Sequence, residues 1–229
     1  MKKFILFLFS SIFLISNIFS IERKISHSYK ADYSLFPDTQ YKDHYINNLT
    51  GKYDIRYCVQ SNLVISKKDA KGYDCAEVLK KLDQMGGLDK ECFGVSFVEP
   101  DSGVRKALFK KAEFDREAGL LYVKDRAAGG LNFDVVIDTY KSSGNIYAVH
   151  GIINKKPDNI FVRGIKKREA EIFVFMQEDE QNISVYALIQ CSYSPLEHKV
   201  FKNLVESSVT IRVVEIQNWF YRMISGKEK

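Results

Sequence analysis

Residues 171–191 have the sequence EIFVFMQEDEQNISVYALIQC, and this stretch decides the fold. Every second residue from 183 to 191 is aliphatic or cysteine, which is the period of a β-strand that buries one face. The polar run at residues 178–182 separates that segment from the apolar run at residues 171–176 and is typical of a turn. A connection this short joins antiparallel neighbours, so the stretch predicts a β-hairpin.

Patterns of period two continue upstream from this hairpin to about residue 93. Short turn sequences at residues 115–119, 141–144 and 157–159 separate the apolar segments. Connections of this length permit hairpins but no helical crossovers, so we expect an antiparallel meander of about six to eight strands. The expected strands lie at residues 93–97, 108–114, 120–123, 133–140, 145–153, 160–164, 171–176 and 183–191.

The meander is followed by a helix-start signature, SPLE, at residues 194–197. It offers a serine N-cap, a proline at the first helical position and a glutamate three residues after the cap. A helix running from there to Ser225 would be about 46 Å long. Six strands span only about 29 Å, so we expect the helix to lie along the sheet diagonal, to overhang the sheet or to break near residues 207–208. Its apolar stripe recurs at spacings of three and four: Phe201, Val205, Val209, Val213, Ile216, Phe220 and Met223.

A short helix is predicted before the meander, at about residues 75–85. Asp74 can cap its first turn, with Glu77 three residues later, and the glycines at 86–87 supply a stop. Residues 53–60 alternate and fit a strand or, nearly as well, a short helix. The expected fold class is therefore α+β: a meander with a short N-terminal helix and a long C-terminal helix packed on it.

The N-terminus predicts export. Residues 1–20 combine Lys2 and Lys3 with an apolar run and end at a small residue, as in a secretory signal peptide. An uncleaved membrane anchor is the alternative, although a span needs about 20 apolar residues and the stretch at residues 4–19 has only 16 residues, three serines and an asparagine among them. We expect a periplasmic, cell-envelope or secreted protein. Residues 21–52 would form an N-terminal arm, loosely ordered or draped over a single α+β domain at residues 53–229.

Export would permit disulfides among the cysteines. Cys58, Cys75 and Cys92 are spaced 17 residues apart and are the candidates, with the pairing left open by the sequence. Cys191 lies on the apolar face of its strand, so we expect it to be a buried free thiol.

The composition and the motifs exclude several function classes. With 45% hydrophobic and 28% charged residues, the chain is neither collagen-like nor wholly disordered. A net charge of +5 is too small for a dedicated nucleic-acid binder. The sequence contains no CxxC, HExxH, GxSxG, GxxxxGK[ST] or GxGxxG motif, so it predicts no metal ligand, cofactor or catalytic residue. Asp134 and Asp138 share a strand face, which we interpret as solvated.

The terminal helix carries the tripeptide Asn218-Trp219-Phe220. With this element order, residues 79–224 resemble a group of uncharacterised bacterial exported proteins. That family has no assigned activity, so the resemblance implies no catalytic residues. A curved antiparallel sheet that grips a long C-terminal helix is also similar to helix-grip, START-like domains, many of which hold apolar ligands between sheet and helix.

We therefore expect a non-enzymatic exported protein that binds a lipid or another apolar ligand between the sheet and the C-terminal helix. The alternative is a structural or protein-interaction module of the envelope, in which the arm and the basic turns at 155–156 and 166–168 dock onto a partner. A hydrolase whose site residues converge from separate strands is a third hypothesis. Membrane contact would come only through an uncleaved signal or at the periphery. The candidate pocket residues are Tyr147, Tyr186, Val213, Ile216, Trp219 and Phe220.

Overall fold

The computed structural model describes residues 22–85, 97–98, 105–106, 108–126, 128–140, 145–157, 164–197 and 202–226. The expected signal peptide at residues 1–20, Cys92 and nearly all of the strand expected at residues 160–164 lie outside the described residues.

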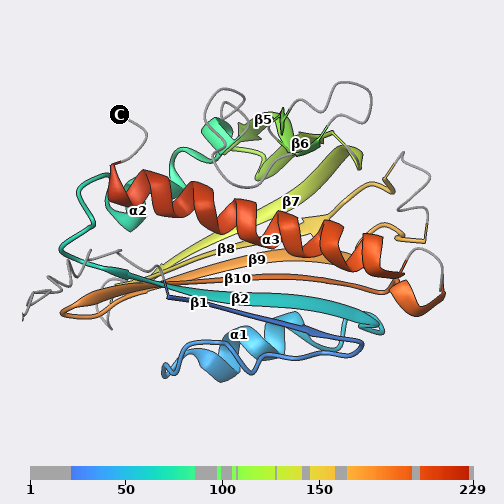
Figure 1. The fold of residues 1–229 in the computed structure, drawn as a ribbon, viewed down its shortest axis with the longest axis horizontal. Helices are drawn as coiled ribbons and strands as arrows, with labels where there is room; N and C mark the ends of the chain where they lie inside the picture. The colour runs from blue at the N-terminus through green and yellow to red at the C-terminus, as the bar shows by residue number, and fades with distance from the viewer. Residues whose placement is uncertain are drawn as a thin grey trace, which may run out of the picture.

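The described residues form one eight-stranded sheet and a short two-stranded ladder. The sheet comprises β1 (Glu22–Ser28), β2 (Tyr57–Ser66), β5 (Phe109–Asp115), β6 (Leu120–Asp125), β7 (Gly129–Tyr140), β8 (Ile146–Ile153), β9 (Ala170–Glu178) and β10 (Asn182–Cys191). The ladder pairs β3 (Phe97–Val98) with β4 (Arg105–Lys106). The sheet order is β1-β2-β10-β9-β8-β7-β6-β5, with every pairing antiparallel. β5 to β10 are therefore six strands of the predicted meander, and β2 and β1 extend it beyond β10 (Figure 1). Of the strand expected at residues 93–97, only Phe97 is described, and it lies in β3 of the separate ladder.

The stretch at residues 171–191 forms the predicted hairpin, β9-β10, in which Ile183 pairs with Glu178. Its turn is closed by Asp179, whose Oδ1 accepts hydrogen bonds from the backbone N–H groups of Gln181 and Asn182, both at 2.7 Å. Because these bonds stabilise the carboxylate, they lower the pKa of Asp179.

The long C-terminal helix, α3 (Lys202–Ser225), covers one face of the sheet. It runs without a break through residues 207–208, is about 36 Å long, and crosses the strands obliquely (Figure 1). It ends at Gly226, whose φ of 72° is the left-handed conformation typical of a helix stop. The SPLE signature forms a separate 3-10 turn, η3 (Pro195–Glu197).

The short helix α2 (Cys75–Leu79) begins as predicted, since the Asp74 side chain accepts a hydrogen bond from the Glu77 N–H at 2.8 Å. It is shorter than expected, because residues 82–85 continue as a 3-10 turn. All five apolar residues of its predicted stripe are nevertheless buried with α3: Cys75, Val78, Leu79, Leu82 and Met85.

The N-terminal arm is draped over the opposite face of the sheet. It contributes edge strand β1 and helix α1 (Lys42–Leu49), which lies below the sheet in Figure 1. Phe36, Tyr45 and Leu49 form a second core with apolar residues of β2, β8, β9 and β10. The segment with ambiguous period at residues 53–60 leads into β2, so the strand interpretation is correct from Tyr57 onward.

In the described part of the chain, no helix has the length and hydropathy that a membrane span requires.

Candidate functional site

An apolar cavity of about 60 Å³ lies between α3 and the sheet. Phe133 and Val135 of β7 and Val174 of β9 line it from the sheet, and Ile216 and Phe220 line it from α3. The cavity is also lined by residues of β5 and β6 and of the turn at residues 82–85. The cavity therefore occupies the layer in which the sequence predicted a ligand site.

Gly151 creates part of this space. It lies in β8 between Val149 and Ile153, which point to the same side and are buried. The three atoms nearest to a Cβ at Gly151 would be side-chain atoms of Phe133, at 3.6 to 3.7 Å, which is ordinary van der Waals contact. A glycine inside a strand leaves unfilled volume beside its neighbours, so this position admits a larger side chain into the cavity.

Arg212 is the only charged side chain among the described residues that line the cavity. Its guanidinium forms a bidentate ion pair with Asp125, with Nε–Oδ2 and Nη2–Oδ1 distances of 2.7 and 2.8 Å. The charge is thus neutralised within the protein, and the cavity presents a hydrocarbon wall.

The cavity is smaller than the roughly 150 Å³ that holds a benzene ring in a protein core. Its size admits a larger ligand only when α3 and the sheet separate. The most extensive contacts of α3 are with β10 and β2, whereas the cavity lies towards β5 to β9. Gln217 fixes α3 to those two strands, because its Nε2 donates to Ser61 O at 3.0 Å and to Val185 O at 2.7 Å. On the cavity side, the Arg212–Asp125 pair joins α3 to the end of β6, so a larger ligand has to be admitted with both attachments in place.

The predicted pocket residues divide between three places. Ile216 and Phe220 line the cavity. Val213, Trp219 and Tyr147 belong to the same hydrophobic core without lining it, and the Trp219 ring packs edge-on against Phe220 with centroids 4.9 Å apart. Tyr186 lies on the opposite face, in the core under α1, because it has the other parity of β10.

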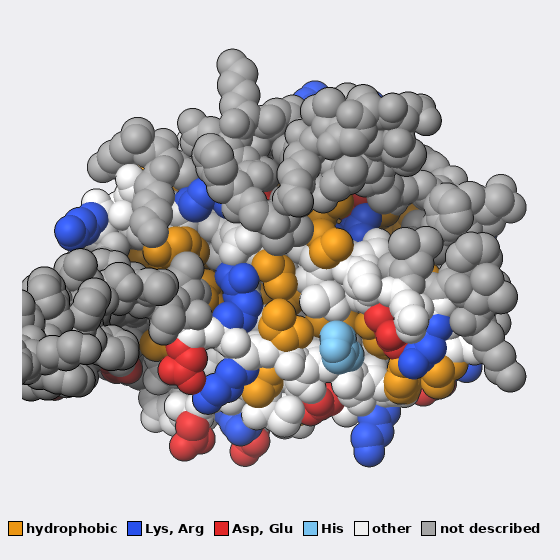
Figure 2. Space-filling view, viewed as in Figure 1, with side chains coloured by type: hydrophobic (Ala, Val, Ile, Leu, Met, Phe, Trp, Pro, Cys, Tyr) orange, Lys and Arg blue, Asp and Glu red, His pale blue; other side chains and the backbone are white. Residues whose placement is uncertain are grey.

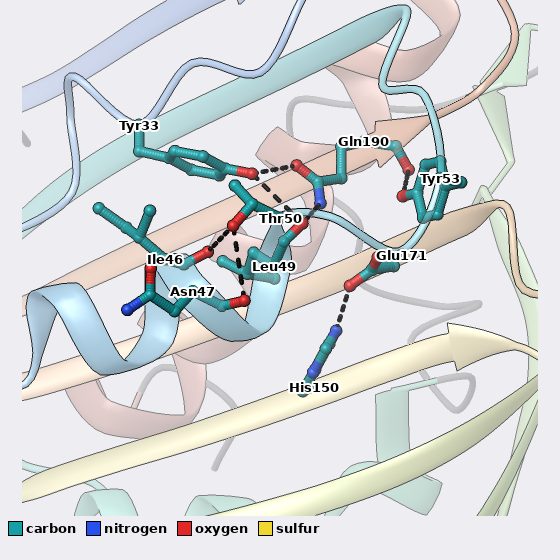
Figure 3. A network of polar contacts seen from close by, with 9 residues as sticks. All are labelled: Tyr33, Ile46, Asn47, Leu49, Thr50, Tyr53, His150, Glu171 and Gln190. Carbon is teal, nitrogen blue, oxygen red and sulfur yellow. Dashed lines mark hydrogen bonds and ion pairs between the residues drawn. The ribbon is translucent and has the colours of Figure 1, made fainter.

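The opposite face carries a network of polar contacts, shown in Figure 3. Tyr33 donates a hydrogen bond to Gln190 Oε1 at 3.1 Å, and Gln190 Nε2 donates to the Leu49 carbonyl at 2.7 Å. Nearby, the Glu171 carboxylate contacts Nε2 of His150. The contacts of Gln190 join the end of α1 to β10, and the separate Glu171–His150 pair joins β9 to β8.

Two tyrosines of this network act as protonated donors. Burial raises the pKa of Tyr33 to about 12. Burial, assisted by the negative charge of Glu171, also raises the pKa of Tyr53, whose hydroxyl donates to Gln190 O at 3.3 Å. Glu171 orients the His150 imidazole, and among the described residues no hydroxyl or thiol nucleophile contacts that ring. The network is therefore a structural clamp for the arm.

A polar hollow of about 280 Å³ adjoins this network at Tyr53. Arg56 and Lys166 line it together with Asp54 and Glu169, so its charges are balanced. Lys166 lies 3.6 Å from Glu169, and the Arg168 guanidinium of the same basic turn lies 3.3 Å from Asp134. Lys166 and Arg168 are therefore each paired with an acidic residue of the protein itself.

The described cysteines are all free thiols. Cys58 lies in the core under α1 and Cys75 in the core under α3, so no disulfide joins these two candidates. Cys191 is a buried free thiol, as predicted. Burial raises the pKa of Cys58 to about 12 and that of Cys191 to about 11. Buried thiols of this kind are poor nucleophiles.

Across the described ranges, no three His, Cys, Asp or Glu side chains are grouped so that they could hold a metal ion. Comparison with protein-family models, with curated proteins and with solved structures gives no match to this chain.

Proposed function

We propose that this protein is exported and binds an apolar ligand between α3 and the sheet. The observation that carries the proposal is the cavity itself: its wall is apolar except for Arg212, whose charge is paired with Asp125. A concave site with an apolar wall is the usual form of a small-molecule site. Export is supported by the sequence of residues 1–20, with two lysines before an apolar run.

The form of the ligand follows from the size of the cavity. A rigid ring system would need far more than about 60 Å³, whereas a flexible alkyl chain can enter as α3 and the sheet separate. Each buried methylene contributes about 0.8 kcal/mol, so a chain of several methylenes offsets the cost of this separation. We therefore favour an acyl or alkyl chain as the bound group.

Native mass spectrometry tests the proposal. The wild-type protein is purified without detergent from the cells that produce it and incubated with 1-dodecanol, and its bound mass is compared with that of Gly151→Val. We expect a releasable apolar adduct on the wild type and its loss from Gly151→Val, because the valine side chain fills the cavity. Equal occupancy of the two proteins, or a wild type that takes up no ligand, would contradict the proposal.

The alternative, a docking module built from the arm and the basic turns, has less support. Phe36, Tyr45 and Leu49 of the arm are at most 4% exposed, so they are committed to the core. Figure 2 shows the α3 face, where hydrophobic side chains are interspersed with basic and acidic ones.

A further inference from the structure

We propose that Asp125 makes the cavity selective for uncharged alkyl ligands over ligands whose anionic group would have to enter the cavity. This inference rests on the proposed function, since it assigns the chemical class of the ligand in the same site. It is carried by the ion pair between Asp125, at the end of β6, and Arg212 of α3.

Every nitrogen of the Arg212 guanidinium is engaged by the protein. Nε and Nη2 donate to the two carboxylate oxygens of Asp125. Nη1 donates to the Ser208 carbonyl at 2.6 Å and also contacts the Ser208 hydroxyl. A ligand carboxylate at Arg212 would therefore have to replace an existing partner rather than find a free one.

Asp125 is held firmly in this position. Its side chain is 0% exposed, and Arg212 is 13% exposed, so the pair is shielded from solvent on the acidic side. The Ala128 backbone N–H donates to Asp125 Oδ1 at 2.7 Å, which fixes the carboxylate in the turn between β6 and β7. Displacing Asp125 would leave a carboxylate buried without its cation, and such a charge is strongly unfavourable.

Uncharged and anionic ligands therefore bind in the cavity at different free-energy costs. An uncharged chain packs against the hydrocarbon wall and leaves the ion pair intact. An anionic group in the cavity either remains without a counter-ion or competes with Asp125 for Arg212. Asp125 therefore determines specificity by supplying internally the anion that Arg212 would otherwise take from a ligand.

The test compares 1-dodecanol with dodecanoate at pH 8, where the carboxylate is ionised. Isothermal titration calorimetry measures the Kd of each ligand for the full-length protein. We expect dodecanol to bind wild type at least tenfold more tightly than dodecanoate, and Asp125→Asn to reduce this ratio at least tenfold. Asparagine keeps the side-chain shape and an oxygen for the Ala128 N–H, but leaves Arg212 without its counter-ion.

A second variant covers the risk that Asp125→Asn does not fold. The double variant Asp125→Asn/Arg212→Gln is neutral at the pair, and we expect it to keep the wild-type preference for dodecanol. Equal binding of both ligands to wild type, or a double variant that shifts as the single variant does, would overturn the role of Asp125. Failure of both ligands to bind wild type would instead overturn the proposed function, and this inference with it.

Discussion

The Glu171 carboxylate is completely buried and contacts Nε2 of His150 on the neighbouring strand. The His150 ring also packs edge-on against Phe173, with centroids 5.8 Å apart. This pair lies beside the network that holds the end of α1 against the sheet (Figure 3). The pair therefore ties β8 to β9 on the face of the sheet that carries the N-terminal arm.

Replacing His150 with phenylalanine should destabilise the protein by about 3 kcal/mol at pH 7, because Glu171 is left as a buried charge without its partner. The contact with Phe173 is retained in this variant. Urea denaturation followed by circular dichroism measures the effect. The double variant His150→Phe/Glu171→Leu should recover most of the loss, and a double variant no more stable than the single one would refute this account.

The arm is a structural part of the domain, so truncating its anchor should be costly. Phe36 is 4% exposed and contacts Phe175 and Tyr186, each with ring centroids 4.9 Å apart. Phe36→Ala should lower the free energy of unfolding by about 3–5 kcal/mol in a urea titration. Ile25→Ala in β1, where the side chain is 42% exposed, is the control and should cost less than about 1 kcal/mol. Similar losses for the two variants would show that the arm does not form this core.

The described thiols should be unreactive in the folded protein. Burial raises the pKa of Cys58 to about 12 and of Cys191 to about 11, and it also raises the pKa of Cys75. In a Cys92→Ser background, iodoacetamide at pH 8 should leave all three unmodified by mass spectrometry. In guanidinium chloride all three should be alkylated. Rapid alkylation of the native protein would show that at least one of these cores is open.

Stability should fall at alkaline pH, and Cys191 should contribute to the fall. The pKa of the Cys191 thiol is about 8.5 in the unfolded chain and about 11 in the folded protein. The contribution of this thiol to the free energy of unfolding is therefore complete below about pH 8.5 and is lost as the pH rises through about 11. The loss by pH 11 is about 2–3 kcal/mol. Urea titrations from pH 7 to 11 should therefore show a shallower decline for Cys191→Ala than for wild type. Parallel curves would mean that Cys191 titrates normally.

Filling the cavity should stabilise the unliganded protein. Gly151→Val adds apolar volume against Phe133 and suits a strand, so we expect a gain of about 1 kcal/mol in the free energy of unfolding. Gly119→Val is the contrasting variant, because Gly119 has a φ of 63° and its Cβ would lie 2.9 Å from Val135 O. That variant should lose stability. A destabilised Gly151→Val would indicate a site already filled.

Much of the fold could be predicted because its signals are local. The β9-β10 hairpin follows from the alternation at residues 171–191, the start of α2 follows from Asp74, and the end of α3 follows from Gly226. The SPLE signature did not mark the start of α3, which begins at Lys202. The structure of the arm was harder to predict, since residues 21–52 lack a clear hydrophobic period. One signal did exist: Tyr186 and Leu188 make the second face of β10 apolar as well, and a strand that is apolar on both faces needs cover on both sides.

The site was predictable only in part. Ile216 and Phe220 belong to the stripe that the spacing of α3 reveals, and both line the cavity. Tyr186 was assigned from its residue type, although its parity places it on the other face. A glycine inside an alternating segment, Gly151, is a sequence feature that could have indicated the cavity between the sheet and α3. The contact of Arg212 with Asp125 spans 87 positions, and no local pattern encodes it.

A crystal structure of the protein with 1-dodecanol tests whether the ligand binds between α3 and the sheet. We predict alkyl density there, against Phe133, Ile216 and Phe220, with the Arg212–Asp125 pair intact. Alkyl density elsewhere on the molecule, with the interface between α3 and the sheet closed and empty, would contradict it.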